Sequence, residues 1–135
     1  MVPAWAAQYL NLPFLGRGRT REGVDCYGLV RLVYQEQLGI ELPSYTEGYA
    51  TPNDQQEIAA MCESAVGLHW KAIPLHEAKV FDGIIFRIMG RTTHFGLVLD
   101  APQFLHAMDG VWSTIERWDS LAWERRVLTA VRYVG

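Results

Sequence analysis

The sequence has few cysteines and no long hydrophobic run. Two cysteines among 135 residues can form at most one disulfide, so no disulfide framework is present. A membrane helix needs about 20 apolar residues in a row, and no stretch approaches that, so we expect no membrane insertion. The first five residues lack a basic start followed by an apolar run. We therefore expect no signal peptide, and synthesis in the cytoplasm with reduced thiols.

Basic charge and metal motifs are also missing. With 12 basic and 15 acidic residues the net charge is -3, so we expect no nucleic-acid partner. No CxxC, HxxxH or HExxH pair occurs, which makes a zinc site at Cys26, His94 and His106 the weaker alternative. We predict neither a metal nor another cofactor. There is no repeat or linker, and the length suits a single domain over residues 1–135.

Helical patterns come first along the chain, and strand patterns follow. The spacing of apolar residues predicts a short helix over 3–10, a helix from Cys26 to about Leu38, and a helix over 52–66 that starts at Thr51 and buries Cys62. After a short extended segment at 70–73, strands are predicted over 80–88, 93–99, 103–108, 111–115 and 127–134. This order predicts an α+β domain, with N-terminal helices packed on a roughly five-stranded antiparallel meander.

Cys26 stands at the predicted first turn of its helix. Asp25 is a suitable N-cap residue, and Gly39 is expected to end the helix. The Cys26 thiol then lies near unpaired backbone N–H groups and the positive end of the helix dipole. Such a position favours the thiolate, which is the nucleophilic form of cysteine. The plainer interpretation is a small buried core residue. The helix start and two later histidines favour catalysis.

Two histidines fall on strands joined by a short turn. His94 begins one predicted strand and His106 lies in the next, so the two imidazoles can lie side by side. Acyl transfer by a cysteine needs a base near the sulfur and a third group that orients the base. We therefore predict His94 as the base and His106 as its orienting partner. A strand histidine on its own is more often structural, and His69 and His76 are interpreted as surface or packing residues.

A glycine-rich loop over 16–23 precedes the cysteine. It carries Arg17, Arg19 and Arg21 but lacks the Gly-Lys-Ser/Thr ending of a phosphate-binding loop. Two interpretations stay open. The arginines belong to a solvated loop, or they flank Cys26 and hold substrate carboxylates by bidentate pairing.

Four segments together resemble one enzyme family. They are Asp25–Val30, Asp82–Phe86, Thr93–Leu99 and Phe104–Ala107. In this order they resemble the NlpC-type cysteine peptidases of bacterial cell-wall turnover, which have a minimal papain-like fold. The segments 12–14 and 42–45, with the loop over 16–23, resemble in particular the branch encoded with phage and prophage tails.

The resemblance implies a role for each of these residues. Cys26 is then the nucleophile, His94 the base and His106 the orienting residue of a Cys–His–His triad. The implied substrates are peptidoglycan stem peptides, typically cleaved between D-glutamate and diaminopimelate. The residues expected to contact substrate are Asp25, Tyr27, Arg17, Arg19 and Thr93.

Two positions depart from the family pattern. Tyr27 replaces the serine that many members have after the cysteine, and Phe14 stands where many have a tyrosine near the site. Neither change touches the triad, but both bear on which bond is cleaved.

Three functions follow from this sequence. The first is a cell-wall cysteine hydrolase carried in a phage tail or tail-like particle, with peptidoglycan and tail proteins as its partners. The second is a non-catalytic tail-assembly component of the same fold. The third is a related thiol amidase or acyltransferase, whose chemistry the triad alone does not separate from the first.

Overall fold

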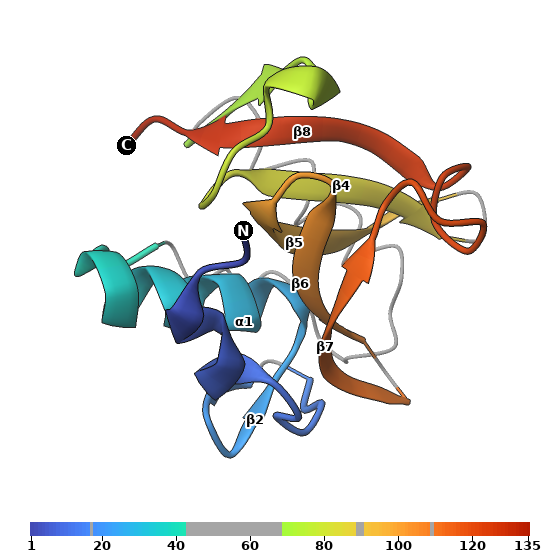
Figure 1. The fold of residues 1–135 in the computed structure, drawn as a ribbon. Helices are drawn as coiled ribbons and strands as arrows, with labels where there is room; N and C mark the ends of the chain where they lie inside the picture. Colours follow the sequence, from blue (N-terminus) through green and yellow to red (C-terminus); the bar gives the residue numbers. More distant parts are fainter. Residues whose placement is uncertain (17, 43–68, 89–90, 109) are drawn as a thin grey trace.

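The computed structural model describes residues 1–16, 18–42, 69–88, 91–108 and 110–135 (Figure 1). The predicted helix over 52–66, with Thr51 and Cys62, lies outside the described residues, as does Arg17.

The helix that carries the cysteine begins and ends where the sequence predicts. Helix α1 spans Cys26–Val33 and continues as one π-helical stretch, Tyr34–Leu38. The Asp25 side chain caps it by accepting a hydrogen bond from the Gly28 N–H at 2.6 Å. Gly39 ends the helix with φ of 67°, a left-handed conformation that glycine adopts without strain. Local capping signals therefore position Cys26.

Two smaller elements precede α1. The short helix predicted near the N-terminus is present. It is a helix of the 3₁₀ type and spans Ala4–Tyr9. Part of the arginine loop forms a two-stranded hairpin, β1 (Arg19–Thr20) with β2 (Gly23–Val24). Figure 1 shows this hairpin leading directly into α1.

One antiparallel sheet forms the rest of the described fold. Its strands are β3 (Trp70–Ile73), β4 (Gly83–Ile88), β5 (Arg91–Asp100), β6 (Gln103–Met108), β7 (Val111–Arg117) and β8 (Val127–Tyr133). A short 3-10 helix, Leu75–Glu77, separates the first two strands.

The sheet is not the simple meander that the sequence predicted. Its strand order is β3-β8-β4-β5-β6-β7, so the last strand inserts between β3 and β4. The described part of the sheet thus has six strands rather than about five. The α+β class and the packing of a helix on an antiparallel sheet are confirmed.

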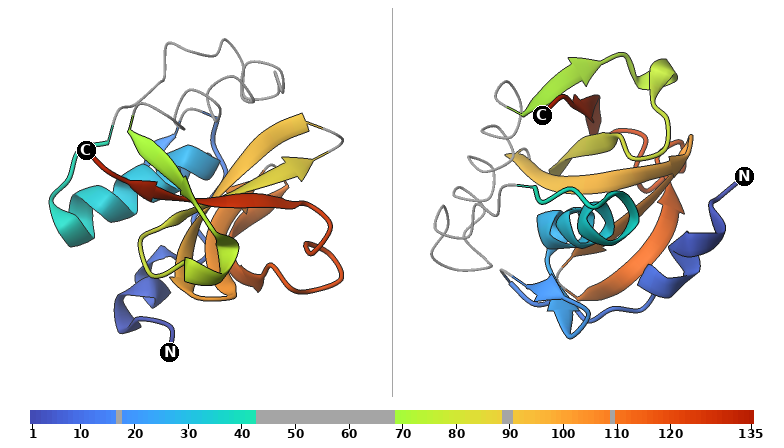
Figure 2. Two further views of the ribbon diagram at one scale, coloured as in Figure 1. Left: turned by 90° about the horizontal axis from the view of Figure 1, so that it is seen from above. Right: turned by 90° about the vertical axis from the view of Figure 1, so that its left-hand side faces the viewer.

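Helix α1 covers one face of the sheet, over β5 and β6 (Figures 1 and 2). Because side chains alternate along a strand, β5 faces two cores. Phe95, Leu97 and Leu99 pack in the core that includes α1, whereas Val98 packs in a second core. His94 has the same parity as Val98, and its ring lies against Phe86 of the second core.

The second core is rich in aromatic rings. We call its four rings the aromatic cluster; they are Phe86, Phe104, Trp118 and Trp123. The rings of Phe86 and Phe104 lie 4.8 Å apart, and those of Phe86 and Trp123 lie 4.9 Å apart. No helix within the described ranges is long and apolar enough to cross a membrane.

Candidate active site

Cys26 lies at the start of α1, against the strand that carries His94. The residue is partly buried and packs against the helix-facing core. Its thiol accepts backbone hydrogen bonds from Phe95 and Tyr27. Phe95 directly follows His94 on β5, so Cys26 lies beside the strand that carries this histidine.

The resting thiol is protonated, although the helix start favours the thiolate. Burial, and after it the negative charge of Asp25, raise the pKa of Cys26 to about 12. The two backbone hydrogen bonds and the charge of Arg19 lower this pKa, but desolvation dominates. The helix start favours the thiolate, as predicted, but desolvation, which the sequence does not reveal, opposes it more strongly. The site therefore needs a base.

The two histidines form a buried hydrogen-bonded pair, as predicted from their adjacent strands. His94 Nε2 lies 2.8 Å from His106 Nδ1, across β5 and β6. The two side chains are almost fully buried, with residue exposures of 2% and 0%. Their rings pack with the aromatic cluster: His94 stacks on Trp123 at 5.8 Å, and Phe86 lies 5.7 Å from His94. This packing holds each imidazole in one orientation.

Both imidazoles are neutral in the resting site. Burial, together with the nearby His106, lowers the pKa of His94 well below 6.5. Burial also lowers the pKa of His106, although the hydrogen bond to Glu116 and the charge of Glu116 raise it in part. A neutral imidazole has one nitrogen free to accept a proton, which is what a general base requires.

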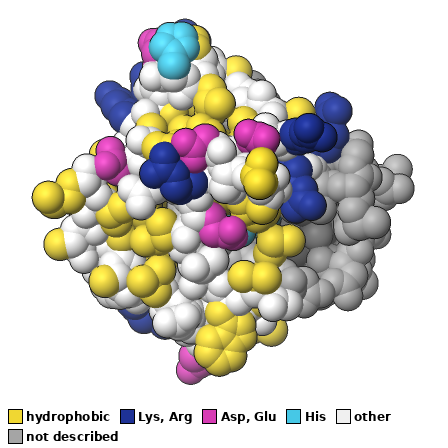
Figure 3. All heavy atoms as spheres, turned by 45° about the vertical axis from the view of Figure 1, so that its right-hand side comes forward, with side chains coloured by type: hydrophobic (Ala, Val, Ile, Leu, Met, Phe, Trp, Pro, Cys, Tyr) yellow, Lys and Arg dark blue, Asp and Glu magenta, His cyan; other side chains and the backbone are white. Residues whose placement is uncertain are grey.

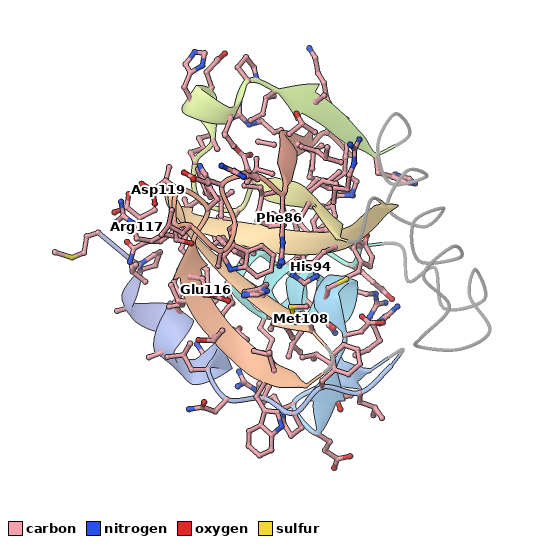
Figure 4. The ribbon with its side chains drawn as sticks, turned by 90° about the vertical axis from the view of Figure 1, so that its right-hand side faces the viewer. Phe86, His94, Met108, Glu116, Arg117 and Asp119 are labelled. Atoms are coloured by element: carbon pink, nitrogen blue, oxygen red, sulfur yellow. The ribbon has the colours of Figure 1, made fainter. Side chains whose placement is uncertain are left out.

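Sequence reasoning missed two residues beside the pair. Glu116 Oε2 on β7 lies 2.6 Å from His106 Nε2, and Glu116 Oε1 accepts a hydrogen bond from Trp123 Nε1 at 2.9 Å. Figure 4 shows His94 and Glu116 on neighbouring parts of the same sheet. The sequence predicts adjacent strands over 103–108 and 111–115, and in the structure the β6–β7 register sets Phe104 opposite Glu116. The Glu116 carboxylate is therefore a diagonal neighbour of His106 on the same face of the sheet. The alternation of side chains along β7 is the sequence feature that could have identified Glu116.

Arg19 and Asp25 are paired with each other. Arg19 Nη1 lies 2.9 Å from Asp25 Oδ1, and both side chains are largely buried. Asp25 thus caps α1 and holds the loop arginine beside the cysteine. Arg21 instead bonds Gln8 and Glu36 near the 3-10 helix. Roles for Arg19 and Asp25 in binding substrate stay predictions.

The structure describes only some of the other residues that the sequence places near the substrate. Tyr27 is buried, with its ring edge-on to Phe95 at 5.6 Å between centroids. Phe14 pairs its backbone with Val24, just before the helix. Arg17 and the side chain of Thr93 lie outside what the structure describes.

The other two histidines of the chain are not fully buried. His76 is exposed and His69 is partly buried, in keeping with surface or packing roles. Among the described side chains, no group of three His, Cys, Asp or Glu is arranged to hold a metal ion. Neither sign of charge dominates the described part of the face in Figure 3, where acidic, basic and apolar side chains are interspersed.

Comparison with known sequences connects this geometry to a family. The sequence model of the NlpC/P60 family matches residues 11–132, which include the cysteine, both histidines and Glu116. The chain belongs to the NlpC/P60 family.

Curated and solved relatives fit this assignment. The chain is similar to the murein DD-endopeptidase MepS/murein LD-carboxypeptidase of Escherichia coli strain K12. The two sequences are 28% identical over 118 residues, which make up 87% of this chain. The aligned region is 54% of that protein, so the NlpC/P60 chain spans about half the length of the curated relatives it matches.

Two solved structures show the same fold. One is an NLP/P60 family protein of Staphylococcus aureus Mu50, described as similar to lipoprotein, which is 25% identical with a TM-score of 0.68. The superposed region covers 96% of this chain and 39% of the Staphylococcus aureus chain. The NlpC/P60 domain of the peptidoglycan hydrolase SagA is 24% identical with a TM-score of 0.64. That likeness covers 96% of this chain and 93% of the SagA domain.

The buried histidines make the stability of this NlpC/P60 domain sensitive to acid. An imidazole in the unfolded chain binds a proton below about pH 6.5, whereas native His94 resists protonation. The unfolded state then binds more protons, so this contribution to stability is complete above about pH 6.5 and is lost as pH falls. For each such histidine the free energy of unfolding should drop by up to about 1.4 kcal/mol per pH unit.

Urea unfolding of the wild type and of His94→Gln tests this linkage. Between about pH 7.5 and about pH 5.5, the free energy of unfolding of the wild type should fall by about 1 kcal/mol more than that of the variant, because glutamine does not titrate. Equal losses in both proteins would contradict the linkage. The matched control is His76→Gln, which removes an exposed histidine and should follow the wild type.

Proposed function

We propose that this chain is a cysteine hydrolase that cleaves peptide bonds in peptidoglycan stem peptides. The observation that carries the proposal is the buried His94–His106 hydrogen bond, on the two strands against which the Cys26-bearing helix packs. Membership of the NlpC/P60 family and the likeness to a murein endopeptidase support the substrate class.

The pair itself favours catalysis over a purely structural role. Burial of both imidazoles lowers their pKa values, which means that the fold disfavours their charged forms. Titratable groups with shifted pKa values, held beside a nucleophilic side chain, cluster at active sites. This feature favours the hydrolase over a non-catalytic tail-assembly component.

In the first step, Cys26 attacks the substrate carbonyl. Sγ forms a bond to the carbonyl carbon while His94 accepts the thiol proton. Because both groups are neutral at rest, proton transfer has to accompany the attack. The resulting oxyanion would lie at the positive end of α1, where the Cys26 backbone N–H can donate to it. His106 keeps the His94 ring in place.

The second half of the reaction returns the enzyme to its starting state. The tetrahedral intermediate collapses, the C–N bond breaks, and the proton on His94 passes to the leaving amine. A thioester on Cys26 remains. Water then attacks the thioester and gives one proton to His94, which returns it to the departing thiol. The product leaves as a carboxylic acid, which releases its proton to the solvent. One water is consumed for each peptide bond broken.

Three kinds of bond in the stem peptides are the leading targets. The sequence resemblance favours the bond between D-glutamate and diaminopimelate. The likeness to the Escherichia coli protein favours a bond of the DD or LD type, as that protein is named a DD-endopeptidase and LD-carboxypeptidase. Association with a phage tail rests on the sequence resemblance alone and stays a prediction.

Digestion of purified muropeptides tests the function and separates these bonds. We expect the wild-type chain to release fragments whose summed mass exceeds that of the parent by one water per cut. Mass spectrometry of stem peptides containing one D-glutamyl–diaminopimelate, DD or LD bond each then identifies the bond. If no muropeptide or intact cell wall is cleaved under conditions where the protein is folded, the proposal is wrong.

A further inference from the structure

Glu116 closes a hydrogen-bonded chain that begins at His94. Its Oε2 lies 2.6 Å from His106 Nε2, and His106 Nδ1 lies 2.8 Å from His94 Nε2. The other carboxylate oxygen, Oε1, accepts the indole N–H of Trp123 at 2.9 Å. The Glu116 side chain is 35% exposed while that of His106 is 0% exposed, so the charge is at the water-facing end of the chain.

The carboxylate sets the direction of every hydrogen bond in this chain. An ionised carboxylate only accepts, so His106 must carry its proton on Nε2. A neutral imidazole has one N–H, which leaves His106 Nδ1 as an acceptor. His94 must then donate from Nε2, and its Nδ1 has no proton. The base nitrogen of His94 is thereby decided by a residue on another strand.

We propose that Glu116 is a positioning residue that acts through His106 to hold His94 in the tautomer whose Nδ1 accepts the Cys26 proton. The catalytic consequence rests on the proposed function. The tautomer itself rests only on the three hydrogen bonds. Substrate peptides need not touch Glu116 for this role.

Trp123 makes the proposal sharply testable. In Glu116→Gln, the indole N–H of Trp123 requires the amide oxygen as its acceptor. The amide NH₂ is then turned toward His106 and can only donate to Nε2. His106 must carry its proton on Nδ1 and donate to His94 Nε2. The His94 proton moves to Nδ1, the nitrogen that should receive the thiol proton.

A second substitution is expected to undo the first. Trp123→Phe keeps an aromatic ring in the cluster but removes the N–H that orients the amide. In the double variant Glu116→Gln with Trp123→Phe, the amide can turn its oxygen toward His106 Nε2–H. The original tautomers of His106 and His94 are then restored. A loss that is relieved by removing a second hydrogen-bond donor is not expected from a structural role.

The experiment reads the tautomers directly. Long-range hydrogen–nitrogen NMR spectra of the labelled full chain should show Nε2–H on His94 in the wild type, Nδ1–H in Glu116→Gln, and Nε2–H again in the double variant. On muropeptides, kcat of Glu116→Gln should fall at least about tenfold, toward the roughly 10⁴-fold that a wrong tautomer causes in serine proteases. KM should change little, and the double variant should recover part of kcat.

Matched controls separate charge from position. Glu124→Gln removes the same charge one residue from Trp123, at an exposed site, and should leave tautomers and kcat unchanged. Trp123→Phe alone reports the effect of the ring change.

The outcomes distinguish the two proposals. A wild-type spectrum with Nδ1–H on His94 overturns the inference, whether or not the variants fold. Wild-type kcat in a folded Glu116→Gln overturns it as well. The expected tautomer switch in a protein that cleaves no muropeptide supports the role of Glu116 while refuting the proposed hydrolase.

Discussion

Replacing Cys26 with serine should reduce kcat/KM on muropeptides by about 10⁴-fold or more, in line with removal of the nucleophile from triad enzymes. A hydroxyl is much less acidic than a thiol, and its oxygen is smaller than sulfur. His94 would then have to remove a more tightly held proton over a longer gap. Binding of the stem peptide should survive, so the loss should appear in kcat.

Product release measured by chromatography, with thermal unfolding of the same samples, checks this prediction. Cys26→Ser is nearly isosteric, so an inactive variant should unfold within a few degrees of the wild type. Cys62→Ser is the matched control, since it makes the same chemical change at the other cysteine. A Cys26→Ser enzyme within tenfold of the wild type would exclude Cys26 as the nucleophile.

His94→Gln should also lower kcat/KM by about 10³-fold or more at neutral pH, because the resting thiol then has no base. The pKa of Cys26 is raised to about 12, so very little thiolate exists near pH 7 without help. Glutamine keeps a hydrogen-bonding side chain in the buried site but cannot take the proton.

The pH dependence of the residual activity separates loss of a base from general damage. With His94 present, kcat/KM should stay nearly flat above about pH 6.5, because the pKa of the base lies well below that value. In His94→Gln the rate should rise about tenfold per pH unit from about pH 7 to about pH 9, following the thiolate fraction. His76→Gln should keep the flat profile. A flat profile in His94→Gln would show that His94 is not the base.

Asp25 illustrates a compromise at the helix start. Its carboxylate caps α1 through the Gly28 N–H and so fixes the cysteine in place. The same charge raises the pKa of Cys26, which opposes formation of the thiolate. Arg19, 2.9 Å from Asp25, partly offsets this effect by lowering the pKa of the thiol. The site thus combines a firmly positioned sulfur with a raised thiol pKa, which is why the proposed hydrolysis would depend on a base.

Local rules in the sequence were sufficient for the framework of the site. The cap at Asp25 and the stop at Gly39 positioned α1 correctly, because each depends on one residue and its nearest backbone. Period-two patterns and turn residues located the strands that carry the two histidines. A short turn between neighbouring strands was enough to predict that His94 and His106 meet.

By itself, the sequence determined the α+β class, the helix that starts at Cys26 and the pairing of two histidines. Only the tertiary structure decided that β8 inserts beside β4, that the thiol is protonated, and that Glu116 and Trp123 complete the chain of hydrogen bonds. Helix caps and turns are set by a few adjacent residues. Strand order and desolvation depend instead on which distant segments come to cover a given atom.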